Sequence, residues 1–142
     1  MTRHPLTVRV GQPKDASAIL ELWRQARSAH ASAPDTLQDV ERLLSEKPGS
    51  LLVADSEDAV IGALIAAWDG WRGNMYRLAV SPEHRRQGIG IALVRAGEEH
   101  LRRQGAFRIT ALVGYDDGVA AGFWDAAGYP QDHEIGRRVR NL

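Results

Sequence analysis

Residues 75–94 read MYRLAVSPEHRRQGIGIALV, and this stretch decides the fold. Side chains alternate in character over residues 76–80, which predicts a β-strand. Pro82 ends that strand, because proline has no N–H to donate to a sheet and restricts the residue before it. A turn with two glycines follows, and residues 91–103 then show the spacing of a helix. The inward side of this helix is expected to carry Leu93, Val94, Gly97 and Leu101.

The start of the helix is predicted to bind an anion. The first N–H groups of a helix have no acceptor within it, and the helix dipole makes this end positive. Gly88 and Gly90 would let a phosphate approach the backbone, and Arg85 and Arg86 add positive charge. The turn therefore looks like a site for a diphosphate, with a turn that merely needs two flexible residues as the alternative.

The spacing of the glycines distinguishes between known phosphate-binding loops. A Walker-type loop ends in lysine, but Lys14 and Lys47 both lie far from the turn. A Rossmann loop has a third small residue where Leu93 stands. Residues 85–90 have the pattern Arg-x-x-Gly-x-Gly after a Val-Ser-Pro strand end. This pattern resembles the acetyl-CoA-binding motif of the GNAT N-acetyltransferase superfamily.

Length and composition indicate one domain spanning residues 1–142. The formal net charge is zero, which disfavours a general binder of nucleic acid or of anionic membranes. The absence of cysteine excludes disulfides, thiolate metal sites and a cysteine nucleophile, and we expect no metal site. No apolar run approaches the ~20 residues of a membrane span, so we expect a cytoplasmic protein.

Strand-like and helix-like segments surround the central unit. Further strands are expected at residues 6–10, 51–54, 60–68, 107–113 and 134–139. Further helices are expected after Asp15 and Asp35, which would act as N-caps, and at residues 119–127. The predicted order is β-α-α-β-β-β-α-β-α-β. It is the order of the GNAT fold, an α/β (α+β) architecture with a mixed central β-sheet flanked by helices.

A second stretch strengthens the resemblance. Residues 117–129, DGVAAGFWDAAGY, are similar to a late signature of the same superfamily. The resemblance then covers essentially the whole chain. It implies acetyl-CoA as the donor and direct attack of a neutral amine on the thioester, with the Leu78 amide donating to the developing oxyanion. The residues it implies in binding acetyl-CoA are Leu78, Ala79, Val80, Arg85, Arg86, Gln87, Gly88, Ile89, Gly90, Ile91, Asp117 and Trp124.

The sequence departs from the family pattern at positions that matter for acid–base chemistry. Trp124 stands where relatives commonly have a tyrosine that protonates the thiolate, and an indole N–H is far too weak an acid for that role. We expect Trp124 to pack or to hydrogen-bond the sulfur. Asp117 replaces an asparagine, which keeps an acceptor and an N-cap but loses the amide donors. Leu112 stands where some members have a glutamate base. Tyr115 is a candidate substitute acid, with a purely structural role as the alternative.

The acceptor site is expected in the loop before the central strand. Trp68 and Trp71 offer aromatic faces to a cationic amine, and Asp69 offers a carboxylate that could also remove its proton. The alternative is that Trp68 is the last core residue of its strand and that Asp69-Gly70 is an ordinary turn.

Three classes of function remain. The first is an N-acetyltransferase acting on a primary amine of a small molecule or a protein. The second is an acyl-CoA-binding sensor or partner subunit with little catalysis, which Trp124 keeps open. The third, acetylation of aminoacyl-tRNA, is disfavoured by the neutral charge and the two lysines. The acceptor and the oligomeric state, a homodimer included, stay open.

Overall fold

The computed structural model describes residues 6–26, 35–114 and 117–142. In chain order the elements are β1 (Thr7–Val10), the 3-10 helix η1 (Pro13–Asp15), α1 (Ala16–Gln25), α2 (Leu37–Glu46), β2 (Leu51–Ser56), β3 (Ala59–Trp68), β4 (Gly73–Val80), the 3-10 helix η2 (Pro82–His84), α3 (Ile89–Gln104), β5 (Ile109–Ala111) and α4 (Gly118–Ala126).

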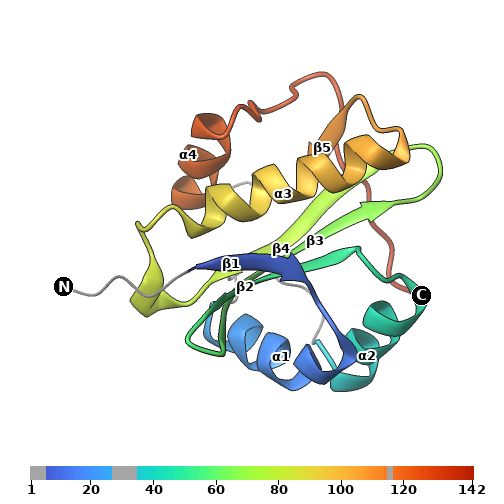
Figure 1. Ribbon diagram of the computed structural model, residues 1–142. Coiled ribbons are helices and arrows are strands. Elements are labelled where there is room, and N and C mark those ends of the chain that lie inside the picture. Colours follow the sequence, from blue (N-terminus) through green and yellow to red (C-terminus); the bar gives the residue numbers. More distant parts are fainter. Residues whose placement is uncertain (1–5, 27–34, 115–116) are drawn as a thin grey trace.

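The five strands form one mixed sheet in the order β1-β2-β3-β4-β5. Neighbours from β1 to β4 are antiparallel, whereas β5 runs parallel to β4. Helices α1 and α2 cover one face of the sheet, and α3 and α4 cover the other (Figure 1). The predicted class of fold, a mixed sheet flanked by helices, is therefore confirmed.

Each face of the sheet has its own apolar core. On the α1–α2 face, Ile19 and Trp23 are buried against the strands. On the other face, α3 buries the predicted inward side, with Leu93 fully inaccessible. A Cβ atom at Gly97 would lie 2.7 Å from Cε of Met75, so the glycine lets α3 lie close against β4. This contact fixes the position of the helix start that follows the central turn.

Asp15 stands at the N-cap of α1, as predicted, but its carboxylate does not cap that helix. It accepts hydrogen bonds from the Gln12 amide at 2.7 Å and from the Arg9 guanidinium at 2.8 and 2.9 Å. Arg9 also donates to Asp55 of β2. One guanidinium therefore joins β1, β2 and the turn that enters α1, and this partnership outweighs a helix cap.

The predicted N-cap at Asp35 is wrong by one residue. Thr36 caps α2, and its hydroxyl oxygen accepts from the Asp39 amide at 3.1 Å. Asp35 instead forms an ion pair with Arg77 of β4 at 2.7 Å. A threonine and an aspartate can both cap a helix, and the distant arginine decides which of the two does so.

The strand predicted at residues 134–139 is also wrong. Residues 129–142 form no strand, and Ile135 and Val139 are exposed. The strand predicted at 107–113 shrinks to the three residues of β5. Alternating side chains give a segment only the tendency to be a strand, because its backbone still needs a neighbour with which to pair.

The Arg9 contacts predict a stability effect. Arg9→Met keeps the aliphatic stem but leaves the Asp15 carboxylate, 7% exposed, without its guanidinium. We expect the free energy of unfolding at pH 7, measured with urea, to fall by about 2 kcal/mol. The control is Arg24→Met, which removes an exposed 3.6 Å pair with Glu21 and should leave the midpoint unchanged. Equal midpoints for all three proteins would contradict the assignment.

The same contact predicts a pH dependence. The hydrogen bonds from Arg9 hold the pKa of Asp15 below its ordinary value of 3.8. A carboxyl with a lowered folded-state pKa stabilises the protein above its unfolded pKa, and this stability is lost as pH falls through the folded pKa. Wild type should therefore lose stability below about pH 4 more steeply than Arg9→Met. Equal acid slopes would show that Asp15 gains nothing from Arg9.

Candidate active site

A β-bulge interrupts β4 at the middle of the sheet. The register with β3 shifts between Ala63 and Ile65, so that Arg77 and Leu78 together stand opposite Leu64. Arg77 has a φ of 57°, in the left-handed region that residues other than glycine rarely adopt. The bulge therefore breaks the alternation of side chains along β4.

The bulge directs two successive side chains to the α1–α2 face. Tyr76 packs in the core on that face, whereas Leu78 packs in the core on the α3–α4 face. The Arg77 guanidinium lies 5.9 Å from the centroid of the Trp23 ring, and the Arg77 carbonyl accepts from the Trp23 indole N–H at 3.2 Å. Arg77 is thus held against α1 through its side chain and its backbone.

One edge of β4 lacks a strand neighbour over its second half. β5 pairs with β4 only over residues 73–75, and the Leu112 amide adds one hydrogen bond to the Met75 carbonyl at 3.1 Å. Within the described residues, no strand pairs with this edge from residue 76 to 80. The open edge includes the three residues predicted to pair with the pantetheine arm, namely Leu78, Ala79 and Val80.

The turn after β4 leads directly into the start of α3. Arg85, Arg86 and Gln87 are exposed, and Gly88 occupies the N-cap with a φ of 79° and no side chain to cap the helix. The first helical hydrogen bond runs from the Ala92 amide to the Gly88 carbonyl at 3.1 Å. The amides of the three preceding residues, 89 to 91, have no acceptor inside the helix. The geometry of this turn therefore suits an anion.

The two glycines of the turn have different surroundings. A Cβ atom at Gly88 would have no atom of the protein within 4 Å, so this position is open. A Cβ atom at Gly90 would lie 3.1 Å from the Phe123 ring of α4. Sequence analysis interpreted both glycines as space for a phosphate and missed that Gly90 also makes room for α4.

The late signature supplies a cap and an aromatic cluster. The Asp117 carboxylate accepts from the Ala120 amide at 3.0 Å and so caps α4, as predicted. Trp124 is buried, with edge-to-face contacts to Phe123 and Tyr129 at centroid distances of 5.3 and 5.1 Å. These contacts give Trp124 the packing role expected from its sequence. Tyr115, the candidate acid, lies outside the described residues.

Tyr129 belongs to this aromatic cluster. Its phenol is a further group that could exchange a proton, and no pattern in the sequence singled it out for that role. Burial and a 2.7 Å hydrogen bond donated to Glu98 both raise the pKa of Tyr129 well above its ordinary value. The phenol therefore stays protonated and serves to join the chain after α4 to α3.

Asp69 lies in the loop between β3 and β4, exposed to solvent. Its Oδ1 atom accepts from the amides of Trp71 and Arg72, both at 2.7 Å. These two hydrogen bonds lower the pKa of Asp69, the bond from the Arg72 amide having the larger effect. A lower pKa makes Asp69 a weaker base. The loop also joins the start of β4, whereas the turn predicted to bind an anion follows its end (Figure 1). The geometry favours the turn-forming role, and the role of Asp69 as a base stays a prediction.

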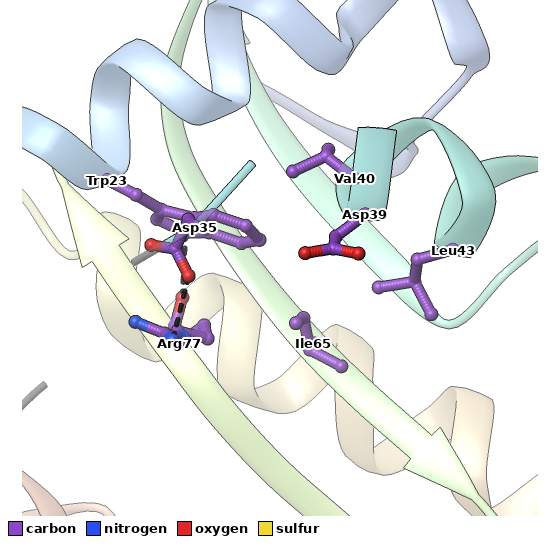
Figure 2. A pocket seen from close by; sticks show the side chains of 7 residues that line it. All are labelled: Trp23, Asp35, Asp39, Val40, Leu43, Ile65 and Arg77. Carbon is purple, nitrogen blue, oxygen red and sulfur yellow. Dashed lines mark hydrogen bonds and ion pairs between the residues drawn. The ribbon is translucent and has the colours of Figure 1, made fainter. Parts of the chain in front are cut away.

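A pocket of about 130 Å³ lies beneath the bulge on the α1–α2 face (Figure 2). We call it the Trp23 pocket. Its wall and floor are formed by Trp23, Val40, Leu43 and Ile65, and its polar groups are Asp35, Asp39 and Arg77. The Trp23 pocket cannot be predicted from the sequence, because its lining residues come from separate elements and no local pattern links them.

Within the described residues, no helix is long and apolar enough to cross a membrane, and no group of three or more metal-binding side chains comes together. The model of the acetyltransferase (GNAT) family matches residues 16–129. The chain belongs to this family.

Curated relatives cover the chain almost completely. An acetyltransferase of Yersinia enterocolitica is 29% identical over 136 residues, which are 94% of this chain and 96% of the relative. An acetyltransferase of Photorhabdus laumondii is 30% identical over 129 residues, 91% of this chain and 90% of the relative. These GNAT relatives indicate that the protein is an acetyltransferase.

Solved structures share the GNAT fold. The aminoglycoside N-acetyltransferase AAC(6')-Iy in complex with CoA has a TM-score of 0.80 at 15% identity and covers 99% of this chain and 98% of its own. Ard1 of Thermoplasma volcanium has a TM-score of 0.75 at 23% identity, over 87% of this chain and 81% of its own. At such identities the likeness shows the fold alone.

The packing of Trp124 predicts how this GNAT protein responds to its replacement. Trp124→Phe removes the indole N–H and part of a buried ring. We expect the unfolding free energy to fall by about 1–3 kcal/mol and kcat to fall by no more than about tenfold. Phe107→Leu, which shortens an aromatic side chain that is 98% exposed, should alter neither quantity. A thousandfold loss of kcat with folding and donor binding intact would show that the indole N–H has a catalytic role.

Proposed function

We propose that the protein is an acetyl-CoA-dependent N-acetyltransferase that acts on a primary amine of a small molecule or a protein. The observation that carries the proposal is the continuity of two unfilled binding features. The open edge of β4 runs directly into the turn, and the turn ends at the uncapped start of α3. The pantetheine arm of acetyl-CoA is extended and carries a diphosphate at one end, so it matches the order of the open edge, the turn and the helix start.

The turn fits the diphosphate in charge and in space. The amides of residues 89–91 point their dipoles outward from a 16-residue helix. The open space at Gly88 leaves room for phosphate oxygens, and the exposed Arg85 and Arg86 can pair with them. Gly90 contributes by allowing α4 to pack beside the helix start.

The open edge of β4 fits the pantetheine arm. Amide groups of the arm can take the hydrogen-bonding positions that β5 leaves free beyond residue 75, as an added strand would. The thioester would then lie near the bulge, where the Leu78 amide is our candidate donor to the oxyanion. The solved GNAT structure with CoA supports this arrangement by analogy of fold.

The reaction needs no nucleophile from the protein. The amine nitrogen attacks the thioester carbonyl, an N–C bond forms, and the C–S bond breaks with its electron pair going to sulfur. The amine loses a proton to water or to a nearby carboxylate, and the thiolate takes one from water. Holding the two substrates together supplies much of the acceleration, and the buried indole of Trp124 takes no part in proton transfer.

A sensor or partner subunit that binds acyl-CoA with little turnover is the second candidate. It rests on Trp124, because the indole replaces the tyrosine expected from the family resemblance. Turnover of acetyl-CoA with a panel of amines separates the two candidates. Tight binding of acetyl-CoA without turnover on any amine would favour the sensor.

A pair of variants at Gly88 tests the diphosphate site. Gly88→Asn and Gly88→Asp place side chains of nearly equal size in the same left-handed conformation, so the backbone cost is shared. Only Asp adds a negative charge where the diphosphate is proposed to lie. We expect calorimetry to show acetyl-CoA affinity falling by about 100-fold in Gly88→Asp and by less than about tenfold in Gly88→Asn. Unchanged affinity in both variants would sink the assignment.

A further inference from the structure

We infer that the Trp23 pocket binds the acceptor as a primary alkylammonium. The class of substrate is either an unbranched side chain that ends in an amine or a small alkylamine. The inference rests on the proposed function and identifies the acceptor side of the same site. It moves the acceptor from the loop at residues 68–72, predicted from the sequence, to the pocket beneath the bulge.

The pocket lies next to the proposed position of the thioester. Arg77 lines the pocket, and the next residue, Leu78, begins the stretch proposed to pair with the pantetheine arm. The bulge sends these two side chains to opposite faces of the sheet. The pocket and the proposed position of the acyl group therefore adjoin consecutive residues of the same strand. The loop at residue 69, in contrast, joins the far end of β4.

The charges of the lining favour a cation. Arg77 is already neutralised, since Asp35 pairs with it at 2.7 Å and the Trp23 ring lies beneath its guanidinium. Asp39 is different, because its partner Arg42 lies at 3.4 Å and its side chain is 58% exposed. Asp39 lines the pocket, and Figure 2 shows its carboxylate between the Trp23 ring and Leu43. An ammonium group in that space would meet an accessible carboxylate.

The volume of the pocket and its apolar floor indicate what kind of chain carries the amine of the acceptor. A volume of about 130 Å³ is well below the roughly 300–1,000 Å³ of sites for drug-sized ligands. Val40, Leu43 and Ile65 provide an apolar floor for methylene groups, and the Trp23 ring provides a face for a cation. The pocket thus suits one alkylammonium chain and is too small for a whole polyamine sugar.

A binding experiment tests the pocket without any need for turnover. The protein is titrated with n-butylammonium chloride, and the indole N–H signals are followed by NMR. We expect the Trp23 signal, assigned with Trp23→Phe, to shift saturably, because this N–H donates to the Arg77 carbonyl at the pocket wall. Sodium butyrate, with the same chain and the opposite charge, should cause no shift. An unmoved Trp23 signal, or an equal shift with butyrate, would overturn the inference.

A matched pair of variants on α2 tests the role of Asp39. Asp39→Asn removes the charge at the pocket, and Glu41→Gln removes one from the same helix at a residue outside the lining. We expect Asp39→Asn to raise the KM for n-butylamine by about tenfold, with kcat and acetyl-CoA affinity nearly unchanged. Glu41→Gln should leave all three quantities unchanged.

The outcomes separate this inference from the proposed function. An equal KM for n-butylamine in both variants would overturn the inference that the Trp23 pocket binds the acceptor. The proposal that the protein is an acetyltransferase would still stand. A saturable shift of Trp23 with no binding of acetyl-CoA would support the pocket and overturn the proposed donor.

Discussion

The functional part of this protein depends on one constraint, which is that backbone amides and carbonyls in a sheet need partners. β3 pairs with one edge of β4 on both sides of the bulge at Arg77 and Leu78, but β5 pairs with the other edge only over residues 73–75. The second half of that edge must therefore be satisfied by water or by a ligand. The proposed binding of the pantetheine arm therefore rests first on the unpaired backbone of β4, and the side chains of the turn add to it.

The position of the turn follows from packing further along α3. Gly97 lets the helix approach β4, and Leu93 and Leu101 are fully buried on either side of it. A larger residue at position 97 would meet Met75 and Leu64 of the sheet. It would push the helix outward, and the amides at the helix start would move relative to the open edge. The core contact at Gly97 therefore determines how the two halves of the donor site align.

The features predicted correctly from the sequence are those that local chemistry determines. The Gly88 turn, the inward side of α3 and the Asp117 cap each depend on residues within a few positions of one another. The wrong predictions depend on distant partners. Asp35 fails as a cap because Arg77, far along the chain, holds its carboxylate. The segment at 134–139 fails as a strand because alternation specifies no neighbour. The Trp23 pocket escaped notice for the same reason, since only the β4 bulge brings Arg77 beneath α1.

A net charge of zero conceals two regions of opposite sign, one in the turn after β4 and one in the Trp23 pocket on the α1–α2 face. The turn at residues 85–91 combines two exposed arginines with the positive end of α3. The Trp23 pocket holds two carboxylates and one arginine that is already paired. Under the proposed function, the positive turn would attract the polyanionic donor, and the acidic pocket would attract the cationic acceptor and repel the donor. The overall charge disfavours a general binder of nucleic acid, but it carries no information on such local sites. Under the proposed function, this division of charge would allow one small domain to hold an anionic donor and a cationic acceptor against each other.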